Sequence, residues 1–181
     1  MSEESHPAPA GLEPVQTFIN SVNLERHLDP LVGPDRLEEW CRTSGLCSGA
    51  SPEELGRLRA FREALRTLIE ANAGTGEASS AWAALEPFAR EAGYGMRIEA
   101  GLPVLEPTGS GAARAIAALL GSVYDAIRRG QWSRLKACRK ESCRWAYYDR
   151  SKNGSGAWCS MAVCGNRMKA KRRRNRAKKP A

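Results

Sequence analysis

The feature that most constrains this chain is a group of four cysteines near its C-terminus. Cys138, Cys143, Cys159 and Cys164 follow the spacing C-x4-C-x15-C-x4-C. Two close pairs on either side of a loop suit tetrahedral coordination, because each pair can supply one edge of the tetrahedron. The spacing predicts that these four thiolates bind one structural Zn²⁺. A thiol redox switch and an iron–sulfur cluster are the alternatives that four cysteines leave open.

Charge is divided unequally along the chain. Residues 1–131 contain 12 Arg, no Lys and 18 Asp or Glu, which gives −6, whereas residues 132–181 contain 16 Lys or Arg against Glu141 and Asp149, which gives +14. The two values account for the formal net charge of +8. A cationic segment beside a metal site is typical of proteins that bind a polyanion. The division predicts two parts with different tasks.

Cysteine usage favours a reducing compartment. The N-terminus has no basic segment followed by an apolar core, so we expect residues 1–11 to form a disordered tail rather than a secretory signal. In the cytoplasm the four clustered cysteines are expected to bind metal rather than to form disulfides. Cys41 shares a helical stripe with Leu37 and is expected to be buried, while Cys47 is expected to be a free loop thiol. The absence of a long apolar run predicts no membrane span, and the Arg-rich composition fits a bacterial, nucleoid-associated protein.

Apolar residues at helical spacing predict that the N-terminal part is mainly α-helical. Helices are expected over 12–22, 34–45 and 110–129, the last of them ended by Gly130. The longest helix is expected to begin at Ser51, because Ser at the N-cap, Pro at the first position and Glu at the third form a capping box. The residues expected to face the core are Val15, Phe18, Ile19, Val22, Leu37, Trp40, Leu55, Leu58, Phe61, Leu65, Leu68, Ile69, Ile116, Leu119, Leu120, Val123, Tyr124 and Ile127.

A shorter helix and one hairpin are expected between the long helices. Pro87 is expected to limit the shorter helix. Residues 96–105 alternate around Ala100-Gly101, which predicts a two-stranded hairpin. Residues 12–131 are therefore predicted to form a mainly α domain with a small β-hairpin (α+β). Because they contain no phosphate-binding loop, dinucleotide fingerprint or catalytic triad order, no catalytic function is predicted for them. The inner face of the shorter helix is expected to carry Trp82, Leu85 and Phe88.

The C-terminal part, residues 132–181, is expected to form a small metal module. Trp132 and Leu135 are expected to pack this module against the preceding long helix. The segment 144–149 has the composition of a strand, and Asn153-Gly154 is a turn signal that predicts a hairpin at that point. Because the module has few large aliphatic residues, we expect it to need its metal in order to fold.

Several motifs of the chain resemble those of a known family. Residues 158–167, Trp-Cys-Ser-Met-Ala-Val-Cys-Gly-Asn-Arg, look like the signature of the CGNR zinc-finger family, and residues 138–143 and 149–153 match that family too. The elements before the finger resemble the ABATE domain, which accompanies this finger in bacterial proteins classed as stress-induced transcription regulators, and Phe18-Ile19-Asn20-Ser21 is similar to a motif near its start. The resemblance implies a treble-clef zinc finger that binds DNA and regulates transcription.

A helix is expected from Ser160 onward, and its continuation is the most basic segment of the chain. A solvated charged tail is the alternative, but an isolated cationic helix repels itself, so we prefer phosphate neutralisation, with about 4–7 contacts and a log–log salt slope of about −4 to −6. Arg167 and Lys169 are expected to orient the helix or to read bases, and Asn166 either to brace the metal site or to read an adenine edge. The remaining expected phosphate contacts are Arg150, Lys152, Lys171, Arg172, Arg173, Arg174 and Arg176.

Four classes of function follow from these features. The preferred one is a zinc-dependent transcription regulator of double-stranded DNA, whose N-terminal domain is a sensor for a small-molecule effector or a dimerisation unit. The second is a protein that binds structured RNA, in which Trp145, Tyr147 and Tyr148 would stack on bases, although packing around the metal is the preferred role of these rings. A thiol-sensing regulator is the third. A treble-clef nuclease is disfavoured, because residues 132–181 contain no His and two acids, so we expect no enzyme activity. The operator, the sign of regulation and a homodimeric state stay open.

Overall fold

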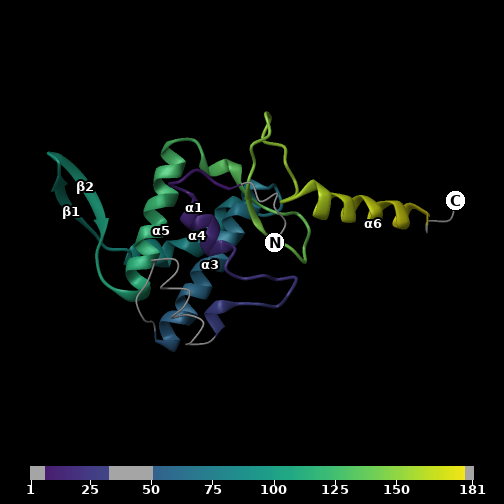
Figure 1. Ribbon diagram of the computed structural model, residues 1–181. Helices are drawn as coiled ribbons and strands as arrows, with labels where there is room; N and C mark the ends of the chain where they lie inside the picture. Colours follow the sequence, from purple (N-terminus) through teal and green to yellow (C-terminus); the bar gives the residue numbers. More distant parts are fainter. Residues whose placement is uncertain (1–6, 33–50, 178–181) are drawn as a thin grey trace.

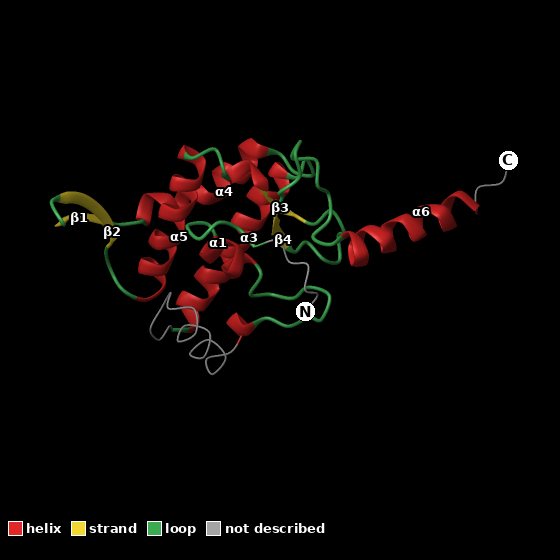
Figure 2. Ribbon diagram, turned by 45° about the horizontal axis from the view of Figure 1, so that its top comes forward, coloured by secondary structure: helices red, strands yellow, loops and turns green. Residues whose placement is uncertain are grey.

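The computed structural model describes residues 7–32 and 51–177. In these residues a helical body is formed by α1 (Glu13–Ile19), α3 (Pro52–Asn72), α4 (Ala78–Glu91) and α5 (Gly111–Arg128). A hairpin of β1 and β2 projects from one end of the body, and α6 (Asn166–Ala177) projects from the other (Figure 1 and, after a rotation, Figure 2). The mainly α architecture with small hairpins is as predicted. The helix expected over 34–45, with Cys41 and Cys47, lies outside the described residues. No helix in the described part combines the length and apolar character that crossing a membrane demands.

The centre of the body is α3, and it begins where the capping box predicts. The Ser51 hydroxyl accepts from the Glu54 amide at 3.2 Å, and the Glu54 carboxylate accepts from the Ser51 amide at 2.8 Å. These bonds satisfy two backbone donors that a helix start leaves unpaired. The predicted apolar stripe is buried throughout and consists of Leu55, Leu58, Phe61, Leu65, Leu68 and Ile69.

The prediction that Pro87 limits α4 is wrong, since the helix continues to Glu91. Pro87 lies on the exposed side of the helix, as does Ala83, whose carbonyl loses its amide partner. Water can satisfy that carbonyl at low cost, so the helix continues past the proline. Trp82 also lies on this outer side and is 44% exposed, which corrects its predicted place in the core.

The inner face of α5 is narrower than predicted. Ile116, Leu119 and Val123 are buried, but Tyr124 is 56% exposed and Ile127 is 43% exposed. The helical stripe turns toward Ala126 instead, whose small side chain lets the helix end lie close to the body. Gly130 follows the helix with a φ of 67°, in the left-handed region that favours glycine at a helix end. The predicted stop is confirmed.

The predicted hairpin is confirmed as β1 (Tyr94–Glu99) paired antiparallel with β2 (Leu102–Pro107). Its two-residue loop has φ of 48° at Ala100 and 81° at Gly101. Positive φ at both loop positions is the requirement of a type I′ turn, whose twist matches that of the strands.

The second sheet differs from the prediction. It pairs β3 (Leu135–Ala137) antiparallel with β4 (Ala146–Tyr148), so that the first cysteine pair lies in the connection between the strands. The prediction of a hairpin that turns at Asn153-Gly154 is wrong, because no strand follows that turn in the described residues. The partner of β4 precedes Cys138, in a three-residue strand too short to show a pattern in the sequence.

The β3–β4 hairpin belongs to the core of the helical body. Leu135, Ala137 and Ala146 lie in the same buried cluster as the α3 stripe. β3 packs against α3 rather than against the long helix as predicted, while η2 (Trp132–Arg134) contacts α5. The charge boundary near residue 131 is therefore not a packing boundary.

Polar side chains of the helical body hold this hairpin by its backbone. The Asn20 amide donates to the Ala146 carbonyl at 2.8 Å and accepts from the Ala146 amide at 2.8 Å, as a neighbouring strand would. Asn72 donates to the carbonyls of Trp132 and Leu135, both at 2.9 Å. Arg66, which is 1% exposed, donates to the carbonyls of Arg144 and Ile19. Buried backbone groups of the finger thus find partners in α1 and α3.

Replacing Asn20 by Ala is expected to lower the free energy of unfolding by about 2–3 kcal/mol, because it leaves the buried Ala146 amide without a partner. Urea unfolding of the zinc-loaded protein measures this change. Asn153→Ala is the matched control, since Asn153 is an exposed loop residue, and it is expected to change stability by less than about 0.5 kcal/mol. Equal effects of the two substitutions would contradict the assigned role of Asn20.

Candidate metal centre and cationic helix

The structure brings the four predicted ligand residues together. Their Sγ atoms all lie within 4.8 Å of one another. The Sγ atom of Cys159 is 3.7 Å from those of Cys143 and Cys164. Four sulfurs about 2.3 Å from a tetrahedral zinc ion are separated by about 3.8 Å, so the spacing fits a ZnS₄ centre.

The protonation of these thiols also fits a bound cation. Hydrogen bonds from the Cys143 and Cys159 thiols lower the pKa of Cys138. Bonding to Cys138 raises the pKa of Cys143 and of Cys159, and burial raises the pKa of Cys164. One thiolate therefore opposes ionisation of the other three. A divalent cation removes this conflict, because it stabilises all four thiolates at once.

A π-helical turn, η3 (Met161–Gly165), explains the spacing of the second pair. The Gly165 amide donates to the Ser160 carbonyl at 3.0 Å, an i to i+5 bond. This turn brings residues five apart to the same side, so Cys159 and Cys164 can face one ion. The Ser160 hydroxyl caps the turn by accepting from the Val163 amide at 3.2 Å.

Asp149 organises the loop between the two cysteine pairs. Its carboxylate accepts from the amides of Ser151 and Gly156 and from Lys136 Nζ, at 2.8–3.0 Å. Burial opposes ionisation of Asp149, but these hydrogen bonds prevail and lower its pKa. A Cβ atom at Gly156 would lie 2.8 Å from Asp149 Oδ1, so the loop needs glycine there. The buried pair of Lys136 and Asp149 has no signal in the sequence.

The predicted cationic helix is present as α6. It extends away from the body into solvent (Figures 1 and 2), and no residue of it is buried. It contains no acid, and its first residue follows directly on the π turn that holds Cys164. All seven predicted basic contact residues on it are exposed, and Arg167 forms an ion pair with Glu25; they are Arg167, Lys169, Lys171, Arg172, Arg173, Arg174 and Arg176.

Asn166 has a contact within the π turn. Its side-chain amide donates to the Ala162 carbonyl at 3.2 Å. The side chain is exposed, so both roles, bracing the metal site and reading an adenine edge, stay predictions.

Arg150 and Lys152 lie in the loop after β4. The Arg150 guanidinium stacks 5.8 Å from the centre of the Tyr148 ring and donates to the Pro7 carbonyl at 2.9 Å. Lys152 is exposed. The described part of the predicted tail packs on the body here, since Ala8 is 6% exposed.

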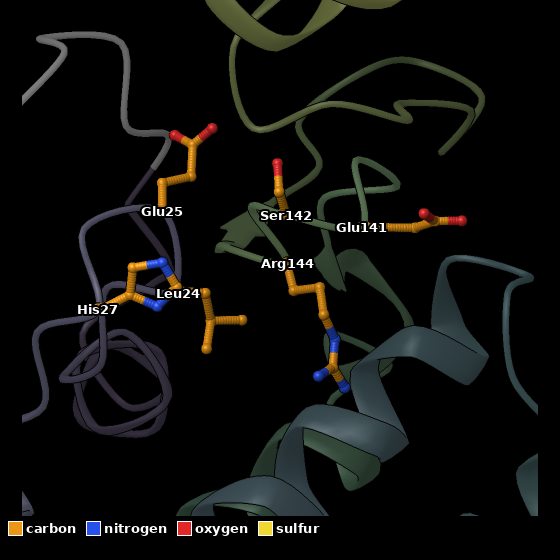
Figure 3. Close-up of a pocket in the computed structure, with 6 residues that line it drawn as sticks. All are labelled: Leu24, Glu25, His27, Glu141, Ser142 and Arg144. Carbon is orange, nitrogen blue, oxygen red and sulfur yellow. The ribbon is translucent and has the colours of Figure 1, made fainter.

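A pocket of about 450 Å³ lies between the helical body and the first cysteine pair. Figure 3 shows side chains that reach it from both parts. Glu25 forms ion pairs with Lys140 and, at 3.4 Å, with Arg167, so this carboxylate joins the body to the first residues of α6. No pattern in the sequence predicts this contact. The lining residues are Leu24, Glu25, His27, Glu141, Ser142 and Arg144.

Comparison with known families agrees with this architecture. Residues 12–126, from α1 to α5, match the ABATE family, described as "Putative stress-induced transcription regulator". The chain belongs to the ABATE family. In this ABATE protein, residues 134–177 also match the CGNR zinc finger, and that match begins at η2, just before β3. No curated protein matches the chain.

The family and the cysteine cluster together establish a zinc-binding regulator of the ABATE family with one structural zinc. The four cysteines would hold the zinc ion, and Cys164 would tie it to the backbone just before α6. The predicted cofactor and family are thereby confirmed.

Proposed function

We propose that this ABATE protein regulates transcription by binding double-stranded DNA through α6. The observation that carries the proposal is a free-standing cationic helix that begins two residues after Cys164, one of the four clustered cysteines. A rigid anchor reduces the entropy lost when the helix docks on a rigid duplex. The hairpin that holds one cysteine pair, followed by a helix after the second, has the order of elements of a treble clef.

The dimensions of α6 support this proposal. Its 12 residues extend over about 18 Å. A B-DNA major groove about 12 Å wide admits a helix of this kind. Arg167 and Lys169, next to the zinc centre, would be held in the groove, and the later basic residues would neutralise phosphates.

Selection from a random duplex pool, with and without a chelator, tests the proposal. We expect enrichment of a common sequence by the zinc-loaded protein and loss of that enrichment after chelation. Equal binding of single-stranded RNA and duplex DNA in competition would instead favour the RNA-binding alternative. Tyr147 speaks against that alternative, because it is 2% exposed and donates its hydroxyl to the Gly156 carbonyl, so it is not available for stacking on a base.

The proposal includes no catalytic step. Of the two acids in the finger, Asp149 is buried and its carboxylate is occupied by Lys136 and two amides. Such a group has no free position for a proton transfer or a catalytic metal. A plasmid-nicking assay with Mg²⁺ is expected to give no cleavage, and cleavage abolished by Glu141→Gln would contradict this part of the proposal.

A sensor role for the helical body is supported by the position of Glu25. This carboxylate pairs with Arg167 and Lys140 beside the pocket, so a ligand or a loop movement there would change the charge next to α6. The pocket lies between the body and the finger, so an effector bound there would contact both. We place the regulatory contact of this proposal at Glu25.

Glu25→Gln is expected to strengthen binding to duplex DNA by about 2–5-fold, because it releases Arg167 and removes a negative charge near the phosphates. Fluorescence anisotropy at low salt measures the change. Glu86→Gln is the matched control, since Glu86 is an exposed acid on α4 that pairs with Arg90, and it should leave the affinity unchanged. A gain of the same size in both variants would indicate a general charge effect and no role for the contact.

A further inference from the structure

The hairpin of β1 and β2, here called the arm (residues 94–107), is held firmly at its root. The Tyr94 hydroxyl donates to the Ala117 carbonyl of α5, and the Thr108 amide donates to the Gly93 carbonyl at 2.9 Å. Arg114 of α5 also donates to the Pro107 carbonyl. Beyond this root the arm projects into solvent (Figure 1). Its direction is therefore fixed although its tip has no packing partner in the described chain.

The strand register divides the arm into two unlike faces. On one face Tyr94, Met96 and Ile98 lie opposite three apolar partners. This apolar face consists of Tyr94, Met96, Ile98, Pro103, Leu105 and Pro107.

The apolar face lies largely in water. Met96 is 69% exposed, Ile98 is 67% exposed and Leu105 is 63% exposed. A two-stranded hairpin is marginally stable by itself, and it usually needs a further layer on its apolar side. With on the order of 100 Å² from each large side chain, the face offers roughly 400 Å², an area that on monomers marks an interaction site.

The other face of the arm carries charged side chains. Arg97 pairs with Glu99 and with Glu106, each at 2.9 Å, and these ion pairs can stay in water. Leu102 and Val104 also lie on this face, where the ion pairs interrupt the apolar surface. Only the face that holds Met96 and Ile98 is apolar throughout.

We propose that the apolar face of the arm packs against the same face of a second copy of this chain. The face carries no charge, and its one hydroxyl, that of Tyr94, is bound to Ala117, so it has no charged group with which to select an unlike partner; it can pack on its own copy across a two-fold axis. Two such faces would bury roughly 800 Å² in total, which is the size of a weak interface. The dimer is therefore expected to have an affinity in the high micromolar range.

This packing determines where the DNA-binding elements lie in the dimer. The arm and α6 project from opposite ends of the body (Figure 1), so the two α6 helices would lie at the two outer ends of the particle. The interface would contain neither zinc nor α6. Dimerisation and DNA binding can consequently be tested separately.

Sedimentation equilibrium of the full zinc-loaded chain without DNA, from low micromolar to several hundred micromolar, tests the proposal. The chain is expected to be a dimer at the upper concentrations. Ile98→Lys is expected to weaken dimerisation by at least about 100-fold, because it buries an unpaired charge. Leu102→Lys is the matched control, since Leu102 is 68% exposed and lies on the opposite face, and it should dimerise as the unsubstituted chain does.

Three results would overturn the proposal. They are a monomer throughout the concentration range, dimerisation of the Ile98→Lys variant at unchanged affinity, and equal loss of the dimer in both variants. Far-UV circular dichroism shows that each variant is folded, and both replaced side chains are exposed, so neither should unfold the body.

Discussion

Removal of zinc is expected to release α6 while the helical body and the β3–β4 hairpin stay folded. Asn20 and Asn72 bind the hairpin backbone without help from the metal. The segment 158–165, by contrast, carries two of the four clustered cysteines, so we expect its position to depend on the metal. Structural zinc contributes roughly 10–16 kcal/mol to the folding free energy of finger peptides. Without the ion, the second cysteine pair has no interaction of comparable strength. DNA affinity should fall by at least about 100-fold, while the melting temperature of the body falls by less than about 8 °C.

Hydrogen exchange measured with and without a chelator separates the two regions. The Ala146 amide should keep its protection, and the amides of residues 161–168 should lose theirs. Cys164→Ser should reproduce the effect of the chelator, whereas Cys47→Ser, which leaves all four clustered cysteines in place, should not. Added zinc should restore DNA binding to the unsubstituted protein alone. Collapse of the whole body on chelation would show that the hairpin depends on the metal, as the sequence had suggested.

Replacing Arg172, Arg173 and Arg174 together by Gln is expected to weaken binding to mixed-sequence duplex DNA by roughly 500-fold at 0.1 M salt. Each phosphate contact contributes about 0.9 to the log–log salt slope, so three lost contacts reduce the slope by about 2.7. These residues lie in the middle of a helix that has no buried residue, so the substitutions should leave the fold unchanged. Titrations at several salt concentrations give the slope directly.

The matched control for this variant replaces the same three arginines by Lys. Lysine keeps the charge and the phosphate contact, so the salt slope should be unchanged and the affinity should stay within a few-fold. Loss of affinity in the Lys variant with the slope retained would assign these positions to base readout. An unchanged slope in the Gln variant would exclude α6 as the phosphate-binding element.

Features that depend on local chemistry could be predicted from the sequence. The capping box at Ser51 determines where α3 begins, and the Ala100-Gly101 turn determines the register of the first hairpin. The spacing of Cys138, Cys143, Cys159 and Cys164 was sufficient to predict one metal site. In each case the residues that interact are close in sequence or share one ligand.

Features that depend on distant partners could not be predicted. Asn20 looks like an ordinary helix end, and only the fold shows that it binds Ala146. The three-residue β3 is too short to show an apolar pattern, so the sequence points to a hairpin at Asn153-Gly154 instead of the observed β3–β4 hairpin. Tyr124 and Ile127 continue an apolar stripe but lie beyond the area that the small body can cover.

The hydrogen bonds between the end of α1 and the β3–β4 hairpin have a consequence for folding during synthesis. Asn20 and Ala146 are 126 residues apart, so the ribosome makes the first roughly 6–25 s before the second. During that interval the amide of Asn20 has only water as its partner. The packing around α1 is therefore completed only after the chain has been synthesised as far as Ala146.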